Sequence, residues 1–388
     1  MNLRAPAAPN HKGKHTGHRK VSEVSAGSPP PRWTGRQRLF LAAICLAGFL
    51  RGAYWALTLP IWHPIDEAAH FAYAASIGSG DGIPTVGRDL VPPDVFRIAK
   101  QHPSQAIVPF SPNDQELWGT SGRQYEGIQP PLYYGLVGAI YALWGKPSAG
   151  LVLTMRLVTV ALGVAALLLT ALAAGRLFPD RPAVRLGAPA LLAAIPAAGG
   201  YSAYITNDGA TLTAAAAILW ASAGLLRKKP TIKQSVTAGI VAGAGFLTRN
   251  SLVLLVLMAA VMLFRSCLAN GVTRMRTAKL LAVMGAGFGA LALPWIAWTR
   301  LAYKGTSITD EFADLVRPIA GTQARTVAGF LRHVSESANG WLDFLWPHPP
   351  PTGFFFAAAA FALIGVAAGL VSAYRRNDRE ARFSLWWL

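Results

Sequence analysis

Charged residues are scarce in this chain of 388 residues, and acidic ones are the scarcest. Asp, Glu, Lys and Arg make up 14% of the residues, hydrophobic types make up 53%, and 18 Asp and Glu stand against 36 Lys and Arg. A soluble domain carries about 25% charged residues. The basic residues lie in short clusters between apolar runs, whereas nucleic-acid-binding proteins group them on one folded face. The composition therefore predicts a polytopic membrane protein in the lipid bilayer, with no nucleic acid as partner.

Cysteine and nucleotide-binding motifs are also scarce. The two cysteines, Cys45 and Cys267, lie inside or at the end of apolar segments, without the spacing of a disulfide or a metal site. The sequence has no GxxxxGK loop, no GxGxxG and no paired-aspartate DxD element. Those absences argue against a cytoplasmic ATPase or an enzyme that uses nucleotide sugars.

Long apolar runs follow a polar N-terminal segment. Residues 1–37 are rich in Pro, Lys, His and Ser and are predicted to be a disordered basic tail without a signal peptide. A bilayer core about 30 Å thick takes a helix of about 20 residues. The sequence predicts an all-α membrane domain over 38–374, and its eight predicted spans are Leu39–Pro60, Leu151–Ala174, Arg185–Ile205, Ala210–Leu226, Ser235–Leu247, Ser251–Cys267, Leu280–Trp298 and Gly353–Tyr374.

The distribution of positive charge decides the topology. If the short apolar run Pro131–Trp144 does not cross, most Lys and Arg residues fall on the side of the N-terminus, as cytoplasmic loops require. If it crossed, three basic clusters would move to the opposite side. Pro131–Trp144 is therefore predicted to be an interfacial helix. Residues 61–149 and 301–352 then form two extracytoplasmic loops of an inner (cytoplasmic) membrane protein with a cytoplasmic N-terminus.

The C-terminal segment has two interpretations. Residues 375–388 begin as a cytoplasmic basic segment and end in apolar and aromatic residues. That ending is either the start of a ninth, truncated span or an interfacial anchor.

Two adjacent carboxylates and a histidine follow the first span. Asp66, Glu67 and His70 lie at the predicted start of a helix in the first extracytoplasmic loop. Acidic residues in a first helical turn commonly cap the helix and interact with its dipole. Capping and a catalytic role both remain open from these residues alone.

Further polar residues lie at the same side of the membrane. Gln129, with the aromatic pair Tyr133 and Tyr134, could be a helix start at the interface or part of a site. The Asn207–Asp208 pair could likewise be an ordinary turn and cap.

Three arginines are predicted to lie at membrane depth near the extracytoplasmic side. Arg51, Arg156 and Arg249 break the charge bias, and Arg249 with Asn250 follows the short run Ser235–Leu247. Charge at membrane depth is expensive and indicates function, although snorkelling is the alternative for Arg156.

The order of these motifs resembles the C-type (GT-C fold) membrane glycosyltransferases. The residues that carry the resemblance, over about 38–374, are Pro64-Ile65-Asp66-Glu67-x-x-His70-Phe71, Gln129-Pro130-Pro131-Leu132-Tyr133-Tyr134, Arg156-Leu157, Asn207-Asp208 and Leu247-Thr248-Arg249-Asn250. That superfamily includes protein O-mannosyltransferases and aminoarabinose transferases, and the chain looks closest to its poorly characterised bacterial members. Its members transfer a sugar from a polyprenyl phosphate outside the cytoplasmic membrane, to a glycan, lipid or protein acceptor.

The resemblance implies a role for each residue. Asp66 would be the catalytic carboxylate, Glu67 a second acid or ligand, and His70 a group that orients them. A base must reach the acceptor proton, and fixed cations stabilise the departing phosphate. Arg51, Arg156 and Arg249 are the cations on the correct side. The residues expected to line the substrate cavity are Gln129, Tyr133, Tyr134, Asn207, Asp208 and Asn250.

A divalent metal and a different function are the open alternatives. His63, Glu67 and His70 form H-x-x-x-E-x-x-H, a weak ligand set in which Glu67 and His70 could share a helical face. No cofactor is otherwise expected beyond the lipid-linked donor as substrate. A transporter or lipid flippase is the competing function, but transporters usually carry internal repeats and polar residues near the midplane, and the sequence has no clear repeat.

Overall fold

The computed structural model describes residues 33–62, 66–86, 88–101, 124–226 and 229–303. Within these ranges the chain is helical, without a β-strand. The predicted span Gly353–Tyr374, nearly all of the loop 301–352 and the segment 375–388 lie outside the described residues. So do most of the tail 1–37 and His63.

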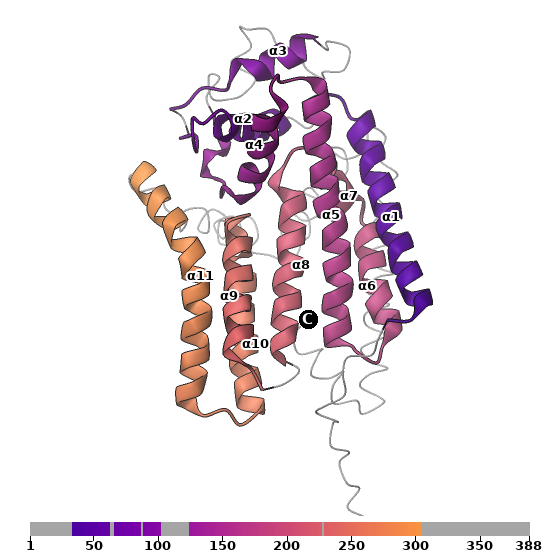
Figure 1. Ribbon diagram of the computed structural model, residues 1–388, viewed down its shortest axis with the longest axis vertical. Helices are drawn as coiled ribbons and strands as arrows, with labels where there is room; N and C mark the ends of the chain where they lie inside the picture. Colours follow the sequence, from indigo (N-terminus) through magenta and orange to yellow (C-terminus); the bar gives the residue numbers. More distant parts are fainter. Residues whose placement is uncertain (1–32, 63–65, 87, 102–123, 227–228, 304–388) are drawn as a thin grey trace, which may run out of the picture.

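Within the described residues, five helices are long and apolar enough to cross a membrane. They are α1 (Gly35–Thr58), α5 (Ala149–Leu177), α8 (Asn207–Leu226), the continuous run of η3 (Asn250–Leu252) with α10 (Val253–Ala269), and α11 (Arg274–Ala302). They run roughly along the vertical direction of Figure 1. Each overlaps a predicted span, and the expected all-α membrane architecture is confirmed.

Shorter helices complete the row. α9 (Ile232–Phe246) packs against α8 and α11, and Gly239 allows the close approach to α11, because a Cβ there would overlap the backbone of Met284. The order across Figure 1 is α11, α9, α8, α5, α6 and α1, with α10 behind. The 13-residue α6 (Pro182–Ala194) and the six-residue α7 (Pro196–Tyr201) lie against α1 and α5.

The predicted continuous span Arg185–Ile205 is broken in the structure. α6 ends at Ala194, Ile195 is extended (φ −67°, ψ 118°), and Pro196 starts α7. Proline has no N–H to donate and fixes its own φ, and it forces the preceding residue out of the helical region. The prediction of one continuous span is therefore wrong, because a count of apolar residues does not register a single proline.

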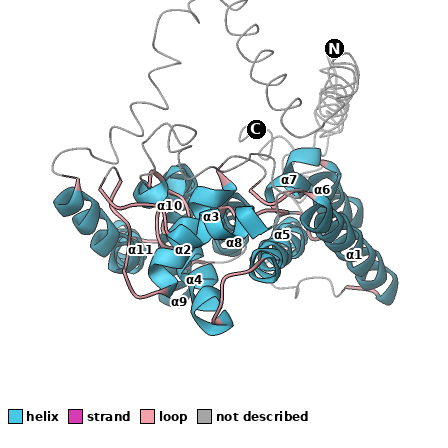
Figure 2. Cartoon of the chain, turned by 90° about the horizontal axis from the view of Figure 1, so that it is seen from above, coloured by secondary structure: helices cyan, strands magenta, loops and turns pink. Residues whose placement is uncertain are grey.

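A separate group of helices covers one end of the row. α2 (Glu67–Gly78), α3 (Pro93–Gln101), η2 (Glu126–Ile128) and α4 (Leu132–Trp144) lie together above α8 and α9 in Figure 1, and Figure 2 shows the same group from above. The close crossing of α2 and α4 depends on Gly78 and Gly138, because a Cβ on either would meet the partner helix. α4 has nearly the bounds predicted for the interfacial helix.

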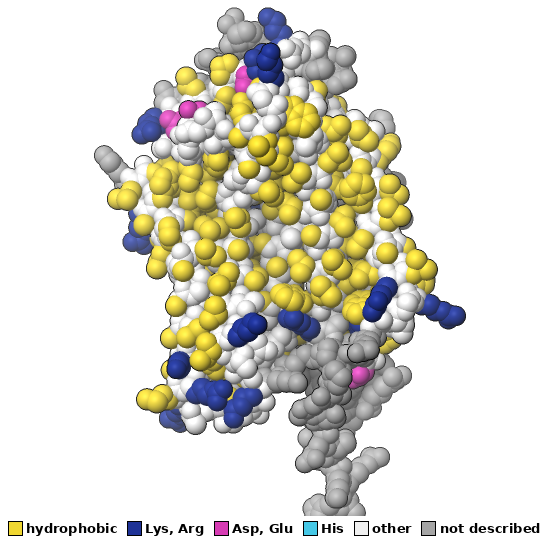
Figure 3. All heavy atoms as spheres, viewed as in Figure 1, with side chains coloured by type: hydrophobic (Ala, Val, Ile, Leu, Met, Phe, Trp, Pro, Cys, Tyr) yellow, Lys and Arg dark blue, Asp and Glu magenta, His cyan; other side chains and the backbone are white. Residues whose placement is uncertain are grey.

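Charge is distributed unequally between the two ends of the molecule. Figure 3 shows a wide apolar band, below which Lys and Arg gather, while Asp and Glu lie mainly above it with the α2–α4 group, beside further Lys and Arg. The lower end holds the start of α1 and the turns after α5, α8 and α10, where the basic clusters of the sequence lie. This separation agrees with the charge partition used to predict the topology.

The topology prediction can be tested at the two ends of α5. Lys146 precedes the helix and Arg181 follows it, and both are exposed. In a variant without cysteine, Lys146→Cys should react with a membrane-impermeant maleimide on intact cells, whereas Arg181→Cys should react only after permeabilisation. The opposite labelling pattern would reverse the orientation, and labelling of both positions on intact cells would place both ends of α5 outside.

Candidate functional site

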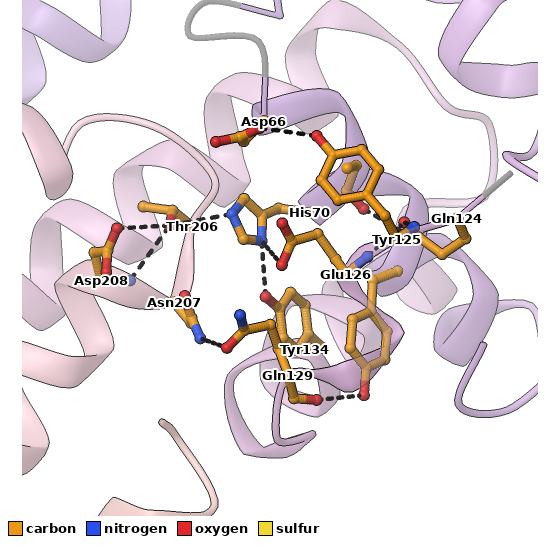
Figure 4. Close-up of polar contacts among 12 residues, drawn as sticks. Asp66, His70, Gln124, Tyr125, Glu126, Gln129, Tyr134, Thr206, Asn207 and Asp208 are labelled. Atoms are coloured by element: carbon orange, nitrogen blue, oxygen red, sulfur yellow. Dashed lines mark hydrogen bonds and ion pairs between the residues drawn. The ribbon is translucent and has the colours of Figure 1, made fainter. Parts of the chain in front are cut away.

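Four segments that are far apart in sequence converge above α8 and α9. They are the start of α2 at 66–73, the segment 124–134, the segment 204–208 that leads into α8, and the turn 247–250 between α9 and α10. Figure 4 shows residues of the first three. The N–H of Leu132, at the start of α4, donates to the carbonyl of Leu247 at 3.0 Å. The motifs that the sequence analysis selected in these segments are therefore brought together.

Asp66 occupies the N-cap position of α2 but does not cap it. Its backbone is already helical (φ −73°, ψ −17°), and its side chain makes no capping hydrogen bond. The carboxylate is exposed, and the Tyr125 hydroxyl donates to Oδ1 at 2.8 Å. The capping interpretation is thus wrong for this side chain, and Asp66 remains accessible to a ligand.

The segment before Asp66 is anchored by a strained residue. Trp62 is not glycine, yet its φ is 62°, a region that a bulky residue adopts rarely. Its indole N–H donates to the Val95 carbonyl at 3.1 Å, and its ring packs on Phe71 with centroids 5.0 Å apart. These contacts hold the chain where it enters the site.

Glu67 points away from Asp66 into the protein. Its side chain is 0% exposed and forms a bidentate ion pair with Arg156 of α5, with Nε to Oε1 at 2.7 Å and Nη2 to Oε2 at 2.6 Å. The N–H of Ile205 also donates to Oε1, at 3.0 Å. The remaining Arg156 donors bind the carbonyls at the outer end of α1 and just after it, those of Ala56, Leu59 and Pro60. Both residues predicted to contact substrate are thus fully occupied within the protein.

His70 links the two sides of the site. Its Nδ1 lies 2.7 Å from the Tyr134 hydroxyl and its Nε2 lies 3.4 Å from Thr206 Oγ1. Thr206 Oγ1 in turn donates to Asp208 Oδ2 at 3.3 Å. A neutral ring satisfies all these contacts if Tyr134 donates to Nδ1 and the Nε2–H donates to Thr206. The resulting chain runs from α4 through α2 to the start of α8.

The protonation state of His70 follows from its surroundings. Burial lowers the pKa of His70 from 6.5 to about 4; Arg249 acts in the same direction, while Asp66 and Glu67 oppose it. Since the unfolded chain binds the proton below pH 6.5 and the folded chain only near pH 4, the folded state loses stability as the pH falls through this window. His70 is therefore neutral at pH 7.

This linkage predicts a difference in acid sensitivity. In wild type, the thermal midpoint should fall as the pH is lowered from 6.5 to 4, with a loss of up to about 3 kcal/mol in the free energy of unfolding. His70→Gln removes the titrating group, so the fall should be smaller in this variant. Thermal unfolding of both proteins in detergent across this range measures the difference. Parallel pH curves for the two proteins would contradict the prediction.

Glu126 is a residue of the site that the sequence analysis did not select. Its carboxylate is 12% exposed and lies 3.8 Å from His70 Nδ1; in Figure 4 it lies between His70 and the Tyr125 backbone. Gln124 Oε1 accepts from the backbone N–H groups of Tyr125 and Glu126, and its Nε2 donates to the Ala69 carbonyl. Glu126 belongs to no recognisable motif, so only its proximity to the Gln129 motif could have pointed to it.

Most of the residues predicted to line the substrate cavity form a packed wall of the site, in which their side chains bond to other residues of the protein. Asn207 donates to Gln129 Oε1 at 3.2 Å and to the Thr248 carbonyl at 3.1 Å. Three more of these residues are buried and bond within the protein: Tyr133 to Thr159, Tyr134 to His70, and Asn250 to the indole N–H of Trp295.

Arg249 and Asp208 form a partly exposed ion pair beside this wall. Arg249 Nη1 donates to Asp208 Oδ1, and the two side chains are 38% and 28% exposed. Arg249 therefore lies within reach of an incoming ligand, unlike Arg156. Arg51 lies elsewhere, against α7, where its Nη2 donates to the Ile195 carbonyl at 3.3 Å. The three arginines predicted to share one anion thus occupy three different environments.

A metal centre has little support from the described side chains. In the part of the chain that the structure describes, no group of three or more His, Cys, Asp and Glu residues is arranged to hold an ion. His63, one of the three proposed ligands, lies outside that part. Glu67, the second, uses both oxygens on Arg156 and Ile205.

Comparison with known proteins identifies a membrane protein family. A family model described as "Predicted membrane protein (DUF2142)" matches residues 49–386. No curated protein and no solved structure matches the chain.

Proposed function

The chain belongs to the DUF2142 family of predicted membrane proteins, and from the geometry of its site we propose that it is a glycosyltransferase. It would move a sugar from a polyprenyl-phosphate donor to a hydroxyl of a glycan, lipid or protein acceptor at the extracytoplasmic face. The observation that carries the proposal is Asp66, an exposed carboxylate at a helix start that caps nothing and is held by Tyr125.

The proposed chemistry needs a base and a cation. Asp66 accepts the proton of the acceptor hydroxyl, and the oxygen of that hydroxyl forms a bond to the anomeric carbon of the sugar. The bond from that carbon to the phosphate oxygen breaks, and the polyprenyl phosphate leaves with the electron pair. Arg249 stabilises the negative charge that grows on the phosphate. Contacts connect the two groups: the His70 N–H donates to the Asp66 carbonyl, the His70 ring contacts Thr206, and Thr206 donates to Asp208, the partner of Arg249.

Glu67 and Arg156 receive a structural role in this proposal. Their mutual pairing leaves neither free for substrate, but it fixes the start of α2 next to α1 and α5. His70 becomes a positioning residue that joins Tyr134 to Thr206 and Asp208. The network as a whole orients the exposed carboxylate and the exposed arginine.

A direct assay tests the proposal. The purified protein is incubated with a panel of radiolabelled polyprenyl-phosphate sugars in lipid nanodiscs, and released polyprenyl phosphate is measured. Release that depends on time and on Asp66 supports the enzyme. Donor binding without release in every case would instead favour a protein that binds or moves the lipid.

Movement of a lipid is the second candidate because one helix of the membrane region is discontinuous. The break between α6 and α7 at Ile195–Pro196 resembles the interrupted helices of transporters. Flipping of a fluorescent polyprenyl-phosphate sugar across proteoliposomes would support this function, and its absence alongside sugar transfer would exclude it.

Arg249 is expected to bind the donor phosphate. Arg249→Ala should weaken donor binding by about ten- to a hundred-fold, the loss typical of a charged hydrogen bond, and should slow single-turnover transfer as well. Arg249→Lys should rescue only partly, because an ammonium cannot make the paired contacts of a guanidinium. Donor titrations and single-turnover rates measure both effects.

A matched ion pair provides the control. Arg97 pairs with Asp94 at 2.5 Å in the same extracytoplasmic group of helices and is 51% exposed, so Arg97→Ala removes similar chemistry outside the site. It should leave donor binding unchanged. Full function of Arg249→Lys would identify a side chain that merely snorkels, and unchanged binding in Arg249→Ala would remove Arg249 from the site.

A further inference from the structure

Arg51 is a cation in a largely lipid-facing helix. It lies seven residues before the end of α1 at Thr58, which is about 10 Å along the helix. Only 17% of the apolar window of α1 is buried inside the protein. The side chain is half-buried and turns toward α7 instead of toward the Asp66 site.

Arg51 lines a cavity. It lies between α1, α5, α6, α7 and α8, leaves about 20 Å³ accessible to the centre of a water molecule, and has no acidic side chain among the described residues that line it. Four glycines widen it: Gly48, Gly52, Gly163 and Gly199. A Cβ on Gly199 would overlap the Arg51 guanidinium. The guanidinium therefore occupies a place that only a glycine at 199 leaves open.

Arg51 uses little of its hydrogen-bonding capacity on the described part of the chain. Nη2 donates to the Ile195 carbonyl at 3.3 Å, while Nε is buried without a partner among the described residues. Arg156 and Arg249, by contrast, each bind a carboxylate. A guanidinium at membrane depth without a counter-charge is costly, and its usual compensation is an anion or water.

We propose that the Arg51 cavity binds the phosphate group of a membrane lipid. A guanidinium offers paired donors that match phosphate oxygens, and Ser202 adds a hydroxyl to the cavity wall. Leu50 and Leu191, the chain neighbours of the lining residues Arg51 and Leu192, are 58% and 71% exposed. Exposed apolar surface for the tails of a lipid therefore lies next to the cation. The site is separate from Asp66 and Arg249 and does not depend on the proposed sugar transfer.

The test compares two lipids that differ only in phosphate. Protein purified in mild detergent is incubated with dioleoylphosphatidic acid or with dioleoylglycerol, and the lipid retained is counted by native mass spectrometry. Wild type should retain phosphatidic acid at least tenfold better than diacylglycerol. Equal retention of the two lipids would overturn the proposal.

Variants locate the binding. Arg51→Leu should lose at least tenfold in phosphatidic acid retention, Arg51→Lys should lose less, and Gly199→Ala should lose retention by displacing the guanidinium while keeping its charge. Arg300→Leu, which removes an exposed arginine of α11, controls for general attraction and should retain wild-type binding. Thermal unfolding of each variant checks that it is folded, and Gly199→Ala and Arg51→Lys keep the test decisive if Arg51→Leu does not fold.

The remaining outcomes are also decisive. Wild-type retention by folded Arg51→Leu or by folded Gly199→Ala would overturn the site. The bound phosphate could belong to a lipid or be free inorganic phosphate. Competition by inorganic phosphate at millimolar concentration distinguishes these two ligands. Full displacement would assign the site to free phosphate, which overturns the lipid, whereas retention of phosphatidic acid in its presence supports the lipid.

Discussion

Asp66→Asn should lower the rate of sugar transfer by about 10²- to 10⁴-fold, the range that a general base contributes, while leaving the fold and membrane insertion intact. The amide keeps the shape of the carboxylate and can still accept the Tyr125 hydrogen bond at Oδ1. It cannot take the acceptor proton. Single-turnover transfer with saturating donor and acceptor measures the chemical step directly.

Asp81 supplies a matched control for this substitution. It is also an exposed carboxylate of the 61–149 segment that accepts one hydroxyl hydrogen bond, from Ser79 at 3.0 Å. Asp81→Asn should leave transfer unchanged. Donor affinity should change little in Asp66→Asn, because the base acts on the acceptor. Near-normal turnover in folded Asp66→Asn would remove Asp66 from catalysis, and equal losses in both variants would indicate a general effect of charge.

The global architecture was predictable because it depends on composition and charge. Apolar runs of sufficient length gave the long helices, and the positive-inside bias made Pro131–Trp144 a short separate helix, which the structure has as α4. The break between α6 and α7 was missed, although Pro196 was visible, because a hydropathy window averages over one proline.

The pairing of charges could not be predicted. Glu67 and Arg156 lie 89 residues apart, and Asp208 and Arg249 lie 41 apart. From the sequence, all three arginines were therefore candidates for binding the donor phosphate, with snorkelling as the alternative for Arg156. Only the three-dimensional arrangement distinguishes a cation that holds the fold from one that a ligand can reach.

Removal of either partner of the Glu67–Arg156 pair should destabilise the protein by about 3–5 kcal/mol, because the other charge stays buried and uncompensated. Their side chains are 0% and 3% exposed. The pair also joins α1, α2, α5 and the segment before α8. Thermal or denaturant unfolding in detergent should therefore show a large loss for both Glu67→Gln and Arg156→Leu. Arg88→Ala, which breaks an exposed pair with Asp89, should cost less than about 1 kcal/mol.

The double variant Glu67→Leu/Arg156→Leu distinguishes a structural pair from a catalytic one. Because no unpaired charge is left, it should be more stable than either single variant. Recovery should be incomplete, since the carbonyls of Leu59 and Pro60 and the N–H of Ile205 lose their partners. If the pair serves the fold, transfer per folded molecule in the double variant should stay well above that of Asp66→Asn. A folded double variant as inactive as Asp66→Asn, or a Glu67→Gln variant of wild-type stability that transfers no sugar, would return Glu67 to the catalytic centre.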